Sequence, residues 1–225
     1  IKNHQKFIFL GNEGKYFIVL DKISLPNVSN PIRWLLQSDT APAVSGRNVT
    51  ITNSSGRLFA NMLLPTDAAV TSNPILTDNF RIEFVPGTVR TNETFLTVMR
   101  ATDSGQIAMT AALLQSNTGN LVGALIGTNV ALLGSATPNS QETYTFTASG
   151  TIQHTITDLL PNTTYAVYQG SVRLSNAVTS ANGTLRFTST NGGMFVIDTN
   201  TSIAPPPAPP PTGCTVSSVS WQNSA

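Results

Sequence analysis

Short apolar or alternating stretches recur along the chain at spacings of roughly eight to twelve residues, separated by turn-forming residues. Helical periodicity is hard to find, so the pattern predicts strands rather than helices. The first two stretches, Lys6–Leu10 and Lys15–Asp21, flank the segment Gly11-Asn12-Glu13-Gly14. Its two glycines permit the positive φ angles of a tight reversal. The chain is therefore expected to begin with a β-hairpin.

The same pattern predicts further strands up to residue 134. They are Ile32–Gln37, Arg47–Thr52, Arg57–Leu64, Phe80–Val85, Thr94–Ala101, Gln106–Leu114 and Thr128–Leu133. The stretch Tyr16–Leu20 is apolar throughout, which is typical of a strand buried on both faces. In Phe80–Phe84 the apolar residues alternate with Arg81 and Glu83, which are expected to face water. We therefore expect stacked antiparallel sheets whose core includes Phe17, Val19, Ile82 and Phe84.

A second unit is expected after the loop-forming cluster Ser135–Ser140, because the strands beyond it are shorter and richer in Thr. Its expected strands are Glu142–Ala148, Thr151–Thr157, Thr163–Tyr168, Thr184–Thr188 and Met194–Ile197. The sequence thus predicts an all-β chain with an antiparallel β-sandwich over residues 1–134. A second, smaller β-sandwich module is predicted over residues 135–203.

Proline dominates residues 204–212, which predicts an extended polyproline II linker because proline donates no backbone hydrogen bond. Residues 213–225 are expected to be an isolated strand or the start of a further domain. A strand of this length does not bury its own apolar residues. If the chain ends at Ala225, we expect Val216, Val219 and Trp221 to add a strand to a sheet edge of a neighbouring copy.

Composition and charge argue against a nucleic acid as a partner and against a membrane-spanning helix. The chain has 225 residues, of which 40% are hydrophobic and only 10% charged, and its net charge is +1 from 12 Lys and Arg against 11 Asp and Glu. Without a long basic run, a nucleic acid is not expected as a partner. No apolar stretch approaches the roughly 20 residues that a membrane-spanning helix needs. Because the sequence begins at Ile1 rather than Met, we expect a processed product or a fragment.

A single cysteine, Cys214, excludes an internal disulfide and a thiolate cluster for zinc. Asn-x-Ser/Thr triplets, the acceptors of N-glycans, are weak support for an exported protein, because they also arise by chance in a chain rich in Asn, Ser and Thr. They occur at Asn27, Asn48, Asn53, Asn92, Asn162, Asn182 and Asn200.

Two strand pairs resemble a known family. The segments His4–Leu10 with Lys15–Asp21, and Asn79–Phe84 with Glu93–Met99, resemble strand pairs in the β-sheet domain of heparinase II/III-like polysaccharide lyases. This resemblance covers about residues 1–134. Residues 135–203 resemble small β modules that follow such lyase domains in secreted bacterial enzymes, mainly at the turn Leu159–Tyr165.

The resemblance implies little catalytic chemistry in this chain. Lyases of this family remove the proton next to a uronate carboxylate and expel the glycosidic oxygen, using Tyr and His on a helical toroid and the adjoining sheet. That toroid would precede Ile1. The chain has only two histidines, and no metal or cofactor motif accompanies them. We expect His154 to be an exposed strand residue, and His4 to be structural or, as the one catalytic candidate, a base.

Arg33-Trp34 is the candidate carbohydrate-binding pair, because an aromatic face stacks on sugar C–H groups and a guanidinium pairs with a carboxylate. The alternative is that Trp34 fills the sheet core together with Ile32 and Leu36. Asp21 ends an apolar strand, where we favour turn capping or sheet hydrogen bonding over a role in glycoside hydrolysis. The turn-like contexts of the remaining aspartates indicate ordinary turn residues: Asp39, Asp67, Asp78, Asp103 and Asp158.

Two functions remain open. In the first, the chain is the non-catalytic C-terminal β-sandwich region of a secreted lyase, which supports the catalytic toroid and contacts an acidic polysaccharide. Lyase activity is then expected only when that toroid is present. In the second, the chain is an extracellular structural or adhesive protein, a stalk or filament subunit that assembles by strand addition between copies. Both place the protein outside the cell or at its surface.

Overall fold

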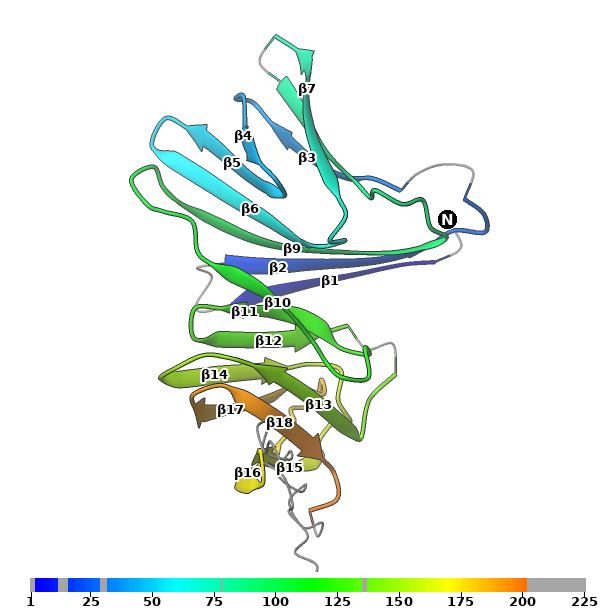
Figure 1. Ribbon diagram of the computed structural model, residues 1–225, viewed down its shortest axis with the longest axis vertical. Coiled ribbons are helices and arrows are strands. Elements are labelled where there is room, and N and C mark those ends of the chain that lie inside the picture. The colour runs from blue at the N-terminus through cyan, green and yellow to red at the C-terminus, as the bar shows by residue number, and fades with distance from the viewer. Residues whose placement is uncertain (1–2, 12–15, 29–31, 78, 135–136, 202–225) are drawn as a thin grey trace, which may run out of the picture.

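The structure, a computed structural model, describes residues 3–11, 16–28, 32–77, 79–134 and 137–201 (Figure 1). Within these ranges every regular element is a β-strand, which confirms the all-β prediction. Accordingly, this part of the chain contains no helix of the length and apolar character needed to cross a membrane. The linker at 204–212, Cys214 and the assembly segment with Val216, Val219 and Trp221 lie outside the described residues.

The strands follow the predicted order with additions. They are β1 (Asn3–Gly11), β2 (Tyr16–Ser24), β3 (Trp34–Ser38), β4 (Ala43–Ser45), β5 (Asn48–Asn53), β6 (Gly56–Leu64), β7 (Ala69–Leu76), β8 (Asn79–Val85), β9 (Asn92–Asp103), β10 (Ala111–Gln115), β11 (Val122–Ile126), β12 (Asn129–Leu133), β13 (Gln141–Phe146), β14 (Thr151–Ile156), β15 (Thr164–Gln169), β16 (Val172–Val178), β17 (Leu185–Thr190) and β18 (Gly193–Asp198).

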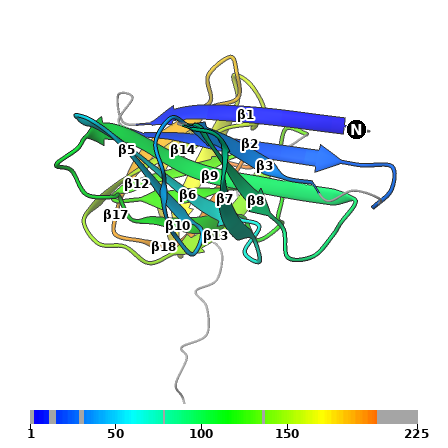
Figure 2. The same ribbon diagram turned by 90° about the horizontal axis from the view of Figure 1, so that it is seen from above.

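These strands form four sheets that stack as layers along the long axis of the molecule (Figures 1 and 2). At one end is the three-stranded sheet β3-β8-β7, and next to it the six-stranded sheet β1-β2-β9-β6-β5-β4. The five-stranded sheet β10-β11-β12-β14-β17 follows, and the four-stranded sheet β13-β18-β15-β16 completes the stack. Each interface between neighbouring sheets holds its own hydrophobic core.

The central position of the six-stranded sheet explains why Tyr16–Leu20 is apolar throughout. Val19 faces the core shared with the three-stranded sheet, whereas Ile18 and Leu20 face the core shared with the five-stranded sheet. A strand covered on both faces has no side that gains from polar residues. The expected burial of Val19, Ile82 and Phe84 is confirmed, and Phe17 is partly buried against the same core.

The five-stranded sheet contains strands from both expected units. Strand β12 pairs in parallel with β14, with Val130 opposite His154, so the sheet runs across the predicted boundary between residues 134 and 135. Beyond that boundary, the Tyr165 hydroxyl donates to the carbonyl of Asn139 and accepts a 3.0 Å hydrogen bond from the backbone N–H of Leu160. This arrangement resembles the tyrosine corner common in β-sandwich domains.

Some strands lacked a readable signal. Strand β7 carries Pro74 and is mostly exposed, which is compatible only with its place at a sheet edge. The sequence pattern did not predict β4, β11 or β16 either. Strand β4 is very short and β11 contains Gly123, whereas β16 is exposed along almost its whole length. One strand is shorter than predicted: the expected strand Gln106–Leu114 begins only at Ala111.

The expectation that His154 is an exposed strand residue is wrong. Only 1% of His154 is exposed, because it shares the inward face of β14 with Ile152 and Ile156. Its Nδ1 atom lies 2.8 Å from the Tyr144 hydroxyl and its Nε2 atom 2.9 Å from the Ser189 hydroxyl. Burial lowers the pKa of His154 to about 4, so the ring is neutral inside the core.

Candidate functional site

The candidate site is built around Asp21, a buried carboxylate near the end of β2. Asp21 lies on the face of the six-stranded sheet that also carries Val19, facing the three-stranded sheet. Its Oδ1 atom is 2.9 Å from Nε2 of His4, and its Oδ2 atom accepts a 3.0 Å hydrogen bond from Nε1 of Trp34. One buried acid therefore holds two candidate side chains that are 30 residues apart in the sequence.

His4 reaches Asp21 diagonally across the β1–β2 pair, because His4 lies opposite Ile23 and a strand places residues 21 and 23 on the same face. The His4 side chain remains 42% exposed. Its ring is thus fixed on one side by Asp21 and open to solvent on the other. This arrangement gives His4 an orienting partner, as a structural or a proton-transferring histidine would need.

Two contacts fix the position of the Trp34 side chain, one through its ring and one through its N–H group. It packs edge-on against Phe84, with ring centroids 5.3 Å apart and an angle of 80° between the planes. The hydrogen bond to Asp21 satisfies the indole N–H, which a half-buried tryptophan requires. These contacts match the alternative in which Trp34 belongs to the core with Ile32 and Leu36.

Arg33 lies on the opposite, outer face of the three-stranded sheet. There its Nη1 atom donates a 2.6 Å hydrogen bond to Glu83 Oε2, and Nε of Arg81 lies 2.8 Å from Glu83 Oε1. The expectation that Glu83 faces water is wrong, since the two guanidinium groups flank it and it is buried. The arginine side chains themselves are 48% and 45% exposed.

The structure therefore brings together His4, Asp21 and Trp34, but it separates Trp34 from Arg33. Arg33 directly precedes β3, and its side chain contacts Glu83, whereas Trp34, the first residue of β3, contacts Asp21 on the other side of the sheet. Glu83 and Arg81 join Arg33 instead. The sequence analysis did not identify Glu83 as the partner of these arginines. Arg81, two residues earlier on the same face of the strand, did indicate a charged face.

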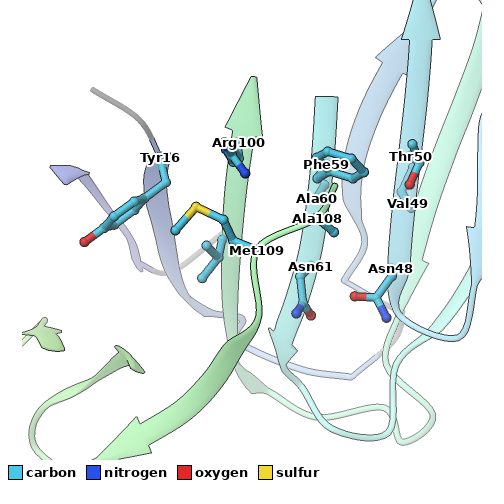
Figure 3. Close-up of a pocket in the computed structure, with 11 residues that line it drawn as sticks. Tyr16, Asn48, Val49, Thr50, Phe59, Ala60, Asn61, Arg100, Ala108 and Met109 are labelled. Atoms are coloured by element: carbon cyan, nitrogen blue, oxygen red, sulfur yellow. The ribbon is translucent and has the colours of Figure 1, made fainter. Parts of the chain in front are cut away.

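A small apolar cavity of about 70 Å³ lies elsewhere, on the face of the six-stranded sheet that carries Tyr16 (Figure 3). Met109 lies beside the ring of Tyr16, and the amides of Asn48 and Asn61 lie next to each other on paired strands. Ligand cavities are typically about 300–1,000 Å³. This cavity is therefore too small for a glycosyl unit.

No cluster of three or more His, Cys, Asp or Glu side chains suited to a metal ion occurs within the ranges that the structure describes. No protein-family model matches the chain, and no curated protein matches it. The resemblance to heparinase II/III-like lyases therefore depends on the strand sequences themselves.

Proposed function

We propose that this chain is the non-catalytic β-sheet region of a secreted, heparinase II/III-like polysaccharide lyase, and that it contacts an acidic glycan through Arg33 and Arg81. The observation that carries the proposal is the Arg33–Glu83–Arg81 cluster on the outer face of the three-stranded sheet. Two half-exposed guanidinium groups around one buried carboxylate leave one net positive charge. Guanidinium groups pair with carboxylate and sulfate oxygens in bidentate fashion.

The first of the two strand pairs that resemble the lyase sheet supports the same proposal, whereas the second is not a pair, because β8 and β9 lie in different sheets. Residues His4–Leu10 and Tyr16–Asp21 lie in the antiparallel pair β1–β2, and Asn79–Phe84 forms most of β8. In this proposal the six-stranded sheet supports a catalytic helical domain supplied by residues outside the chain. The His4–Asp21 pair is then a structural feature of the sheet edge.

Glycan binding is the direct test. The chain is titrated with heparan sulfate and alginate oligosaccharides by isothermal calorimetry at low and at physiological salt. We expect the double variant Arg33→Ala/Arg81→Ala to bind about tenfold more weakly than the unmodified chain, with a smaller salt dependence. Arg186→Ala is the matched control, since Arg186 is an exposed strand arginine of the distant five-stranded sheet. An equal loss in Arg186→Ala, or no binding by the unmodified chain, contradicts the proposal.

Activity separates the supporting role from a catalytic one. We expect the purified chain to form no unsaturated uronate product, followed by its ultraviolet absorbance, from either glycan. Product formation that disappears in His4→Ala would make His4 a catalytic base and overturn the non-catalytic assignment. The gene gives a second test: a reading frame upstream of Ile1 that encodes several hundred residues with helical periodicity supports the proposal, and a short leader contradicts it.

A specific observation favours the second candidate function, an extracellular structural or adhesive subunit. Strand β16 is an edge of the four-stranded sheet, and its Val172 and Val178 are 62% and 65% exposed. Exposed apolar edge strands accept strands from other chains. Deletion of residues 213–225 followed by light scattering tests this role: loss of assemblies on deletion favours it, whereas assemblies that survive unchanged, or a monomeric parent chain, exclude it.

A further inference from the structure

A polar cavity of about 320 Å³ opens beside the end of β2, and none of the residues of the Arg33–Glu83–Arg81 cluster lines it. Four segments meet there: the end of β2, the loop after β6, the start of β9 and the turn between β10 and β11. The residues that give it its character are Lys22, Asp67, Arg90, Asn92, Glu93 and Gln115. The cavity therefore lies between the six-stranded and five-stranded sheets, at one edge of their shared core.

Buried and partly buried contacts hold one wall of the cavity in place. Gly119, at the tip of the β10–β11 turn, lines the cavity. The flanking Thr118 Oγ1 and Asn120 Nδ2 donate hydrogen bonds of 2.8 and 3.3 Å to the two carboxylate oxygens of Glu142. Glu142 is itself buried and belongs to β13. The turn is thus attached to the neighbouring sheet rather than free to collapse into the cavity.

The loop after β6 is held in a similar way. Arg47 Nη1 donates to the carbonyl oxygen of Leu63 at 2.8 Å and to that of Pro65 at 3.3 Å. Pro65 lines the cavity. A cavity whose walls are ordered before a ligand arrives avoids the entropic cost of ordering loops on binding.

An ion-pair network of Arg90, Asp67 and Glu93 forms part of the lining. Arg90 donates to Asp67 Oδ2 at 2.7 Å and to Glu93 Oε2 at 3.0 Å. Hydrogen bonding by Arg90 lowers the pKa of the Asp67 carboxyl, so that group stays ionised near neutral pH. Lys22 is the second cation of the lining; its Nζ atom donates to the Gly134 carbonyl, and the charge of Asp158 acts on it.

Amide groups complete the lining. The Ser24 hydroxyl donates a 2.7 Å hydrogen bond to Asn92 Oδ1, which places the Asn92 NH₂ group on the other side of the carboxamide. Gln115, the last residue of β10, also lines the cavity. The lining therefore contains hydrogen-bond donors, on Lys22, Arg90 and the amides, as well as carboxylate and amide acceptors.

We propose that this cavity binds a neutral glycosyl residue. Each sugar hydroxyl both donates and accepts a hydrogen bond, so a lining that offers both donors and acceptors complements it. The carboxylates of Asp67, Glu93 and Asp158 offset the positive charges of Arg90 and Lys22, so an anion gains no net attraction there. The volume lies at the lower end of the range for ligand cavities, about 300–1,000 Å³. This site is independent of the acidic-glycan contact proposed for Arg33 and Arg81.

Nuclear magnetic resonance of the isotope-labelled full chain tests the proposal, with the methyl glycosides of glucose, galactose and N-acetylglucosamine as probes and glucuronate as the anionic comparison. We expect at least one neutral glycoside to shift the amide signals of Thr94, Gln115 and Gly119. The variants Asn92→Ala and Gln115→Ala are expected to bind it about tenfold more weakly, because each removes ligand hydrogen bonds. Asn117→Ala is the matched control, an exposed residue of the same turn that does not line the cavity.

Three results would overturn the proposal. The first is the absence of shifts with every neutral glycoside, and the second is shifts confined to residues away from the cavity. The third is tighter, salt-dependent binding of glucuronate, which would make the cavity an anion site. Native spectra of the variants, recorded without probe, confirm that any loss of binding occurs in a folded chain. Because Arg33 and Arg81 do not contribute, the test succeeds or fails separately from the acidic-glycan proposal.

Discussion

At the scale of single residues, several buried polar side chains have specific hydrogen-bond or ion-pair partners. Asp21 accepts a hydrogen bond from Trp34 Nε1 and contacts His4. Glu83 forms ion pairs with two arginines, and His154 lies between two hydroxyl groups. A buried polar group without partners costs far more than a paired one gains. These residues are therefore sensitive positions for stability, whatever their role in function.

The first prediction concerns Asp21. Asp21→Ala leaves the Trp34 indole N–H without its acceptor and removes the buried partner of His4, so we expect the free energy of unfolding to fall by about 3 kcal/mol. Urea unfolding followed by circular dichroism measures this change. Asp39→Ala, at an exposed turn residue, is the control and is expected to change the same quantity by less than about 0.5 kcal/mol. Equal effects in the two variants would show that the buried contacts of Asp21 add nothing.

The second prediction concerns the pH dependence of stability. The pKa of His154 is about 4 in the folded protein, below the usual value of about 6.5 for an unfolded chain. Between these values the unfolded chain binds a proton that the folded protein does not. The free energy of unfolding should therefore fall as the pH is lowered from about 6.5 to about 4, by about 3 kcal/mol in total, and this contribution is fully present above that window.

Urea unfolding at a series of pH values measures this dependence. In His154→Gln the contribution of the ring is gone, so the slope across the window should flatten, whereas His4→Gln should retain it. The same slope in His154→Gln as in the unmodified chain would contradict the assignment. A loss of slope in His4→Gln as well would also contradict it, because the slope would then not be specific to His154.

At the scale of elements, the spacing of neighbouring strands decides which residues a strand accepts. Gly123 on β11 lies opposite Leu132 on β12. A Cβ atom at Gly123 would lie 1.8 Å from the backbone carbonyl oxygen of Ala131. Backbone atoms of a central strand do not move aside cheaply, so only glycine fits this position.

The third prediction follows from this close approach. We expect Gly123→Ala to lower the free energy of unfolding by about 3 kcal/mol, because β12 must shift between two packed cores. The control is Gly105→Ala, at an exposed position where an added Cβ has no neighbour within 4 Å. Thermal unfolding followed by circular dichroism compares the two variants. If Gly123→Ala and Gly105→Ala have the same melting temperature, β11 and β12 do not approach each other as closely as described.

At the scale of the whole molecule, the stack of four sheets is continuous. The five-stranded sheet has one face in the core shared with the six-stranded sheet and the other in the core shared with the four-stranded sheet. Ala131 and Leu133 of β12 face the first core, while Val130 and Leu132 face the second. Residues on both sides of the 134/135 boundary therefore stabilise the same layer.

The fourth prediction is that the described stack unfolds as one unit. Calorimetry of the chain should give a single transition whose calorimetric and van't Hoff enthalpies agree. Fragment 1–134 should expose the face of β10, β11 and β12 that the four-stranded sheet covers, and fragment 135–203 the part of its core that those strands cover, so both should bind the dye ANS. Two resolved transitions, or a fragment 1–134 that folds without binding dye, would instead support two independent domains.

The sequence by itself determined the class of the fold, most of its strands and the orientation of their side chains. Alternation and turn residues are local signals, which is why the β1–β2 hairpin and the two-sided burial of Tyr16–Leu20 could be predicted. The same alternation places His154 on the face of Ile152 and Ile156, although its polarity led to the opposite expectation.

Only the tertiary structure decided what each face meets. The parallel pairing of β12 with β14, the two arginines around Glu83 and the joining of His4, Asp21 and Trp34 all connect residues from different strands. The polar cavity likewise assembles four segments from distant parts of the chain. A strand's period of two specifies which side of a sheet a residue occupies, but carries no information on which layer covers that side.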